Sequence, residues 1–124
     1  MKPWDLQTHL KSGREYGFDD RLRRPCSKIV CYDGFQVSVQ ASNAHYSTPR
    51  DNEGPYTHVE LGFPLEPVED WAEYAENPDD LTRTIYPYVP IGLVEAVLEA
   101  HGGVDWTATV WEINSTEEEK ENGD

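Results

Sequence analysis

Carboxylates recur at helical spacing between residues 66 and 76, and they are the first residues whose types and positions could do chemistry. Offsets of 0, 3, 4, 7 and 10 place them on one side of a predicted helix, and the five residues are Glu66, Glu69, Asp70, Glu73 and Glu76. At about 1.5 Å rise per residue the row is roughly 15 Å long, a sparse imitation of the phosphates along one DNA strand. The pattern has two interpretations: a solvated face, or a surface that binds a cationic partner.

A long polar connection, residues 42–55, and the residues that follow it form a second candidate site. Aromatic rings stack on bases or on cations, and an arginine can hold a phosphate or a carboxylate with two hydrogen bonds. A small anion pocket for a nucleotide-type ligand could therefore be built from His45, Tyr46, Arg50, Tyr56 and His58. The alternative is that Arg50 pairs with the neighbouring Asp51 or Glu53 and only fastens the loop to the sheet.

The spacing of cysteines and histidines gives little support to metal binding or nucleophilic catalysis. Cys26 and Cys31 lack the paired C-x-x-C spacing of a zinc site, and twelve residues lie between His45 and His58. A catalytic pair of Cys31 with either histidine is conceivable, but Cys31 is expected within a strand and not at an activating helix N-terminus. No phosphate-binding glycine-rich loop or hydrolase motif occurs. We expect no enzymatic activity, no cofactor and no metal.

Charge is distributed unevenly along the 124 residues, whose formal net charge is −14. Residues 1–24 carry six Lys or Arg against four Asp or Glu, whereas residues 26–113 carry fifteen acidic residues against three basic ones, Lys28, Arg50 and Arg83. Such a surface repels DNA, RNA and anionic lipid and attracts cationic surfaces, an effect that salt weakens. The expected partner is therefore a basic protein, with no direct contact to nucleic acid or membrane.

Alternating residues on either side of Asp33-Gly34 predict a β-hairpin over residues 28–40 with a two-residue turn. In the register that pairs Tyr32 with Phe35, one face of the hairpin is apolar and carries Val30, Tyr32, Phe35, Val37 and Val39. The opposite face is mainly polar, so we expect one face in the core and the other in contact with water.

The remaining elements complete an α+β pattern. Two helices are predicted, the first over residues 67–76 and the second from Pro90 to a stop at Gly102-Gly103. Residues 57–63 read as a third strand in which Val59, Leu61 and Phe63 alternate with polar residues. Thr84–Val89 is extended and contains Pro87, which suits an edge strand or a loop that lies on the sheet. Trp106–Ile113 is expected as a last strand that is apolar on both faces. We expect an antiparallel sheet of four to five strands with two helices.

The chain divides by composition into three parts. Residues 1–24 form a basic N-terminal arm, in which Pro3–Lys11 is either a short helix that ends at Gly13 or an irregular strap. Residues 25–114 form a single core domain, and residues 115–124 an acidic tail that we expect to be disordered, since it has no apolar residue. No stretch approaches the apolar length of a membrane span, so a cytoplasmic location with reduced cysteines is expected.

Several short motifs together resemble a recurring family of small proteins encoded by tailed phages. The matching segments are Gly17–Arg24, Pro25-Cys26, Asp33-Gly34-Phe35, Ser38–Ser42, His45–Arg50, Gly54–Glu60, Tyr86–Val89 and His101-Gly102-Gly103. The resemblance implies a viral origin and a non-structural accessory role in the host cell. It implies no catalytic residues.

Charge and resemblance together favour a phage accessory protein that acts by binding. Its acidic surface would imitate DNA and inhibit a host nucleic-acid-binding or defence protein. The alternative is a protein that sequesters a small nucleotide-type signal through residues 45–58. A third interpretation is an oligomeric module without a ligand, which the two-faced last strand would favour.

Overall fold

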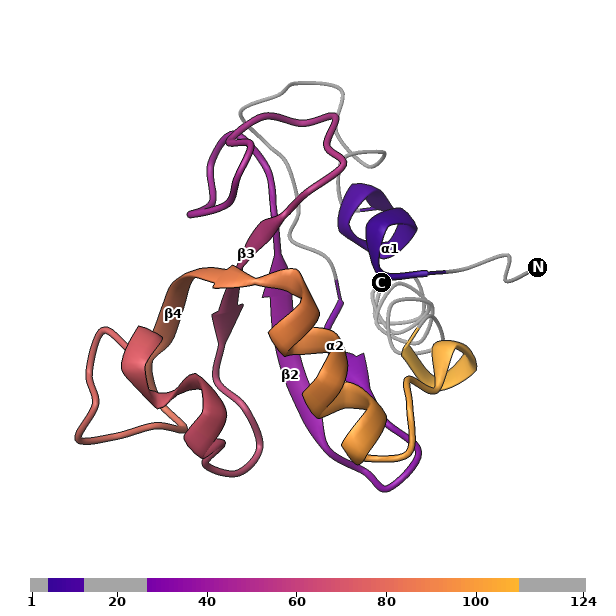
Figure 1. Cartoon of the computed structure of the whole chain (residues 1–124). Coiled ribbons are helices and arrows are strands. Elements are labelled where there is room, and N and C mark those ends of the chain that lie inside the picture. The colour runs from indigo at the N-terminus through magenta and orange to yellow at the C-terminus, as the bar shows by residue number, and fades with distance from the viewer. Residues whose placement is uncertain (1–4, 13–26, 110–124) are drawn as a thin grey trace, which may run out of the picture.

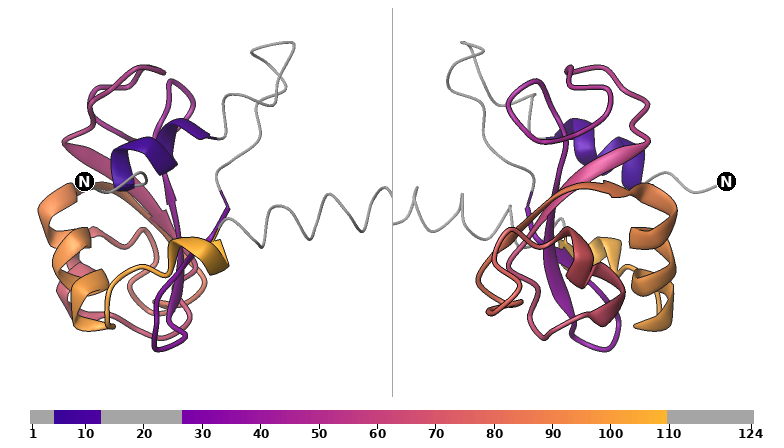
Figure 2. Two further views of the ribbon diagram at one scale, coloured as in Figure 1. Left: turned by 90° about the vertical axis from the view of Figure 1, so that its right-hand side faces the viewer. Right: turned by 60° about the vertical axis from the view of Figure 1, so that its left-hand side comes forward.

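The computed structural model describes residues 5–12 and 27–109, which form an α+β fold around a four-stranded antiparallel sheet (Figures 1 and 2). The strands lie in the order β1-β2-β3-β4, so each pairs with its neighbour in sequence. In chain order the elements are α1 (Leu6–Ser12), β1 (Ile29–Val30), β2 (Gln36–Gln40), β3 (His58–Gly62), the 3₁₀ helix η3 (Glu69–Tyr74), β4 (Ile85–Pro90) and α2 (Ile91–Ala100). The predicted fold class is confirmed. None of the helices in the described ranges is long and apolar enough to cross a membrane.

The hairpin lies where predicted, but the predicted register is wrong by one residue. Ile29 pairs with Val37, and the loop contains three residues, with Gly34 at φ +96°. A three-residue loop of this kind places a glycine in the left-handed region next to a bulge, whereas the prediction assumed a two-residue turn. Because side chains alternate along a strand, the shift turns the first strand over. Ile29 and Cys31 are buried, and the residues turned away from the core are Val30 and Tyr32.

The third strand is confirmed, although its predicted end is wrong. Val59 and Leu61 are completely buried in β3. Phe63 was expected to continue the alternation, but it follows the last strand residue, has φ +51° and is 49% exposed. The left-handed backbone at Phe63, directly before Pro64, directs the ring away from the core, so its apolar character does not report burial.

Strand β4, which was predicted as an edge strand, contains a β-bulge opposite β3. Val59 pairs with Val89 but Leu61 pairs with Tyr86, so β4 holds one more residue than β3 over this interval. Tyr86 and Val89 are both fully buried, three positions apart, and the intervening Tyr88 is 43% exposed at φ +54°. The bulge therefore interrupts the alternation and points Tyr88 outward.

Helix α2 begins and ends as predicted. Pro90 stands at its N-cap, and Gly102 and Gly103 follow its end with φ values of +92° and +88°. The Gly103 N–H donates to the carbonyl of Leu98 at 2.9 Å, which closes the last turn. Helix α2 lies across one face of the sheet (Figures 1 and 2). Its buried residues are Val94, Val97 and Leu98.

The predicted last strand, residues 106–113, is wrong in its described part. Residues 106–109 are helical, and residues 110–113 lie outside the described ranges. The local reason is Asp105, whose carboxylate accepts the N–H of Ala108 at 3.0 Å as an N-cap. The segment nevertheless lies along the outer edge of β1, because Val30 accepts the Asp105 N–H and donates to the hydroxyl of Thr109.

Of the two alternatives for the N-terminal arm, a short helix or an irregular strap, the structure has a helix, α1. The carboxylate of Asp5 accepts the N–H of Thr8 at 2.8 Å and so caps the first turn. Leu6 and Leu10 are buried in the same apolar cluster as the sheet residues, and His9 between them is 1% exposed. The helix thus contributes to the core, while the remaining residues of the arm and the tail at 115–124 lie outside the described ranges.

Candidate functional site

The segment that carries the predicted acidic stripe is shorter and more tightly wound than predicted. Only Glu69–Tyr74 is helical, as the 3₁₀ helix η3, so the α-helix predicted over residues 67–76 is wrong. Its backbone leaves the helix at Ala75, and the N–H of Glu76 already donates to the carbonyl of Ile85 in β4 at 3.0 Å. Because Glu76 is bonded to the sheet only two residues after Tyr74, the helix cannot continue to residue 76.

A single buried tryptophan anchors η3 to the core. Trp71 is 0% exposed, and the centroid of its ring lies 6.2 Å from the ring centroids of both Phe35 and Tyr86. In a 3₁₀ helix residues three apart lie above one another, so Trp71 and Tyr74 share the inward row. Asp70 and Glu73 share a second row, and Glu69 lies in a third. The three carboxylates within η3 therefore occupy two of the three rows of the helix, so they form a broader surface than a single line.

The five predicted carboxylates are all exposed, and we call them the acidic face: Glu66, Glu69, Asp70, Glu73 and Glu76. Among the residues that the structure describes, none of the five forms an ion pair with a lysine or arginine. Within the same ranges the one ionic contact of the group is from Glu66 to His101, with 3.9 Å between Oε1 and Nε2. The charge of this face is therefore directed mainly to solvent.

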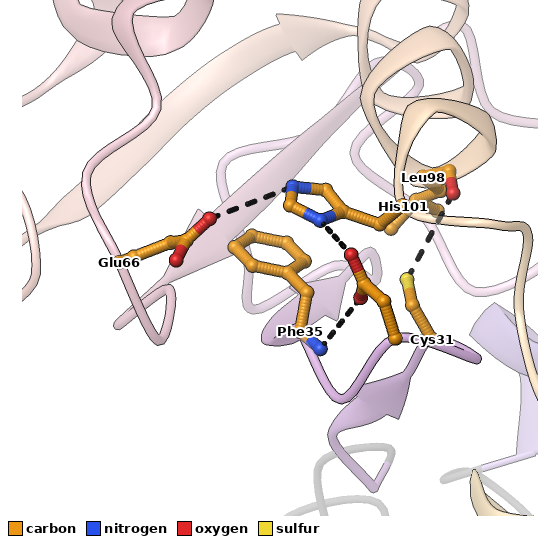
Figure 3. A network of polar contacts seen from close by, with 6 residues as sticks. Cys31, Phe35, Glu66, Leu98 and His101 are labelled. Carbon is orange, nitrogen blue, oxygen red and sulfur yellow. Dashed lines mark hydrogen bonds and ion pairs between the residues drawn. The ribbon is translucent and has the colours of Figure 1, made fainter.

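His101 connects the acidic face to the hairpin loop (Figure 3). Its Nδ1 lies 2.6 Å from a carboxylate oxygen of Asp33, and its ring stacks on Phe35 with 4.1 Å between centroids. The other Asp33 oxygen accepts the N–H of Phe35 at 3.0 Å. Hydrogen bonds from Phe35 and then from His101 lower the pKa of Asp33. The loop, the end of α2 and Glu66 are thus held together by one imidazole.

The polar connection at residues 42–55 is fastened by its own side chains. The Ser42 hydroxyl lies 2.7 Å from Nδ1 of His45 and accepts the N–H of Ala44. Burial lowers the pKa of His45. The Asp51 carboxylate accepts the N–H groups of Glu53 and Gly54 at 2.9 and 3.0 Å. These local bonds hold the loop without Arg50.

The structure does not gather all five residues of the predicted ligand site. Tyr56 is 2% exposed, and its hydroxyl donates to the carbonyl of Asp51, so it is a core residue. Nδ1 of His58 lies 3.0 Å from the hydroxyl of the adjacent Thr57. Tyr46 and Arg50 do meet, with the guanidinium carbon 5.2 Å from the ring centroid, and both are exposed.

Arg50 does not make the predicted ion pair with Asp51 or Glu53. Within residues 5–12 and 27–109 its guanidinium forms no ion pair with any carboxylate, and it lies over the Tyr46 ring. Tyr88 adds a second ring to this group. Its ring centroid lies 5.8 Å from that of Tyr46, and the two ring planes are inclined by 49°. Sequence reasoning missed Tyr88, because only the bulge in β4 turns it outward.

Cys31 has the surroundings of a structural thiol. It is 2% exposed, and its sulfur lies 3.9 Å from the carbonyl oxygen of Leu98. Burial, and then the charge of Asp33, raise the pKa of the thiol from 9.0 to about 11. No group of three or more His, Cys, Asp or Glu residues in the described ranges is arranged to hold a metal ion.

The raised pKa predicts that Cys31 reacts slowly with thiol reagents in the folded protein. Two pKa units reduce the thiolate fraction by about 100-fold, and burial slows access further. The Cys26→Ser variant isolates Cys31, and its reaction with a chromogenic disulfide at pH 7.5 measures the rate. We expect the rate to rise by at least 100-fold in denaturant. Equal rates in the folded and unfolded protein would contradict this environment.

Compared with known proteins, the chain matches no family model, no curated protein and no solved structure.

Proposed function

We propose that the protein acts by binding, and that its acidic face occupies the nucleic-acid-binding site of a basic protein. The observation that carries this proposal is the exposure of all five carboxylates without a lysine or arginine partner among the described residues. If the chain is a phage accessory protein, as the resemblance implies, the partner is a host defence or nucleic-acid-binding protein.

The anchoring of η3 supports a recognition role for this surface. Trp71 holds the segment in the core, so the carboxylates are presented by a fixed backbone and lose less conformational entropy on binding. At about 2.0 Å rise per residue, Asp70 and Glu73 stand about 6 Å apart along the helix axis. This is close to two phosphate steps of a DNA strand, at about 3.4 Å each along its axis.

Electrostatics would make such binding fast and sensitive to salt. A protein of net charge −14 attracts a basic surface over a distance set by the Debye length, about 8 Å at physiological ionic strength. The partner's lysines and arginines, which normally bind phosphates, would pair with the carboxylates instead. Catalysis plays no part in this mechanism.

Reversing three charges of the acidic face tests the proposal. We expect Glu69→Lys/Asp70→Lys/Glu73→Lys to weaken binding to the partner by at least 100-fold, because attraction becomes repulsion. The partner is first retained from host lysate at low salt, identified by mass spectrometry, and shown to bind duplex DNA. The measurement is then the displacement of that DNA by wild-type and variant protein.

The matched control is Glu53→Lys/Glu95→Lys/Glu99→Lys, which reverses three exposed acids outside the acidic face. Each triple variant replaces three negative charges by three positive ones, so both move the net charge from −14 to −8. Full displacement by the control and none by the acidic-face variant would support the proposal. Equal losses in both would show that net charge alone acts, and full displacement by the acidic-face variant would overturn the proposal.

A further inference from the structure

The exposed group formed by Tyr46, Arg50 and Tyr88 shares no residue with the acidic face. We call it the tyrosine–arginine cluster. Tyr46 and Arg50 come from the polar connection, and Tyr88 comes from the bulge of β4. The two segments are joined directly, because the N–H of Tyr88 donates to the carbonyl of Tyr46 at 3.1 Å. Two regions forty residues apart in sequence thus present three side chains together.

The backbone conformation at Tyr88 is unfavourable, and complete burial of the side chain does not compensate for it, because the ring is partly exposed. A φ of +54° suits glycine and is unfavourable for a residue with a Cβ. The Tyr88 ring is 43% exposed and packs at a tilt against Tyr46. A large aromatic ring at a position that favours glycine indicates that the ring itself has a use.

The guanidinium of Arg50 is arranged to bind an anion. Its carbon lies over the Tyr46 ring, 5.2 Å from the ring centroid, and this cation–π contact leaves the N–H donors of the guanidinium unused. Among the described residues no carboxylate takes those donors. The nearby Glu60 carboxylate accepts the backbone N–H of Tyr46 at 3.1 Å, which holds the ring that supports the arginine.

We propose that the tyrosine–arginine cluster binds a small phosphorylated aromatic molecule of about mononucleotide size. Arg50 would hold the phosphate with two hydrogen bonds, and the aromatic base would stack on the exposed rings of Tyr88 and Tyr46. Both ligand parts are required, because an arginine alone binds phosphate weakly in water and two exposed rings alone bind a base weakly. The proposal stands independently of the acidic face.

Titration of ¹⁵N-labelled protein with three probes tests the two parts separately. The probes are adenosine monophosphate, adenosine and inorganic phosphate, at about 0.15 M salt so that the net negative charge of the protein is screened. We expect the monophosphate to shift the amide signals of Tyr46, Arg50 and Tyr88 and to bind at least 10-fold more tightly than either partial probe. Equal affinity for adenosine and its monophosphate, or no shift at these residues, would overturn the proposal.

Two variants separate the roles of charge and ring. Arg50→Gln should weaken monophosphate binding at least 10-fold and leave adenosine binding unchanged, whereas Arg83→Gln, another exposed arginine, should change neither. Tyr88→Gly removes the ring and relieves the backbone, so it should keep or raise the melting temperature while it weakens the monophosphate at least 10-fold. Tyr32→Ala, which removes an aromatic ring that is 69% exposed, is the matched control and should bind as the wild type does. Unchanged affinity in Tyr88→Gly would overturn the role of the ring.

Discussion

Trp71→Ala should lower the free energy of unfolding by about 3–5 kcal/mol, the range for truncation of a buried tryptophan. The Trp71 side chain is completely buried, contacts the rings of Phe35 and Tyr86, and directs its indole N–H toward the carbonyl of Leu93 in α2 at 3.5 Å. Since domains of this size are stable by about 5–15 kcal/mol, the loss is a large part of the total.

Chemical denaturation followed by circular dichroism measures this loss. Trp71→Phe keeps an aromatic ring and should lose less than the alanine variant, because the remaining cavity is smaller. Tyr32→Ala is the control for a 69% exposed aromatic side chain and should change stability by less than about 0.5 kcal/mol. A loss below about 1 kcal/mol in Trp71→Ala would mean that η3 is not anchored as described.

Acidification from pH 7 to pH 4 should destabilise the protein by about 3 kcal/mol through His9 alone. Burial lowers the pKa of His9 from 6.5 to about 4, although its contact with the carbonyl of Ser27 raises it in part. Between these two pH values the unfolded chain binds a proton at His9 that the folded protein does not bind. The free energy of unfolding therefore has its full value, as far as His9 is concerned, above about pH 6.5, and it decreases as the pH falls toward 4.

The His9→Gln variant should lose the part of the pH dependence that His9 contributes, because glutamine keeps a donor near Ser27 but does not titrate in this range. Burial also lowers the pKa of His45, which acts in the same direction and remains in the variant. The measurement is the unfolding free energy at several pH values between 4 and 7. The lowered pKa of Asp33 acts in a separate window, below its ordinary value of 3.8. An unchanged slope in His9→Gln would contradict the buried neutral imidazole.

Elements defined by several consistent local signals could be predicted from the sequence. Helix α2 has a proline at its start, apolar residues at helical spacing and two glycines at its end, and it lies where these signals place it. The hairpin was located by Asp33-Gly34, yet its register was missed, because glycine serves equally in a two-residue and a three-residue loop. That difference decides which face of the sheet each side chain of the first strand occupies.

Elements decided by contacts distant in sequence could not be predicted. Residues 106–113 include four large apolar residues that would lie on both faces of a strand, namely Trp106, Val110, Trp111 and Ile113. This pattern favours a buried strand, but the cap at Asp105 starts a helical turn there. An aspartate before such a run can serve as an N-cap, but the sequence pattern alone does not show that Asp105 does so. In the same way the length of η3 depends on the bond between Glu76 and β4, which no local pattern reveals.

The candidate sites divide along the same line. The exposure of the acidic residues follows from their helical spacing opposite Trp71, so the acidic face could be expected in either helix type. The tyrosine–arginine cluster depends on the bulge that turns Tyr88 outward, and only its Tyr46 and Arg50 were expected. Tyr56 was expected in the site because it flanks the polar connection and an aromatic ring can stack on a base, but the ring is buried in the core.

Both margins of the sheet are already closed to an additional strand. On the β1 side the backbone groups of Val30 are bonded to Asp105 and Thr109, and on the β4 side Glu76 bonds Ile85 while Pro87 has no N–H to offer. Margins protected in this way resist the edge-to-edge pairing that joins β-proteins into aggregates. Recognition of a partner would then depend on side chains instead of shared backbone ladders, so single surface substitutions could retune specificity without disturbing the fold.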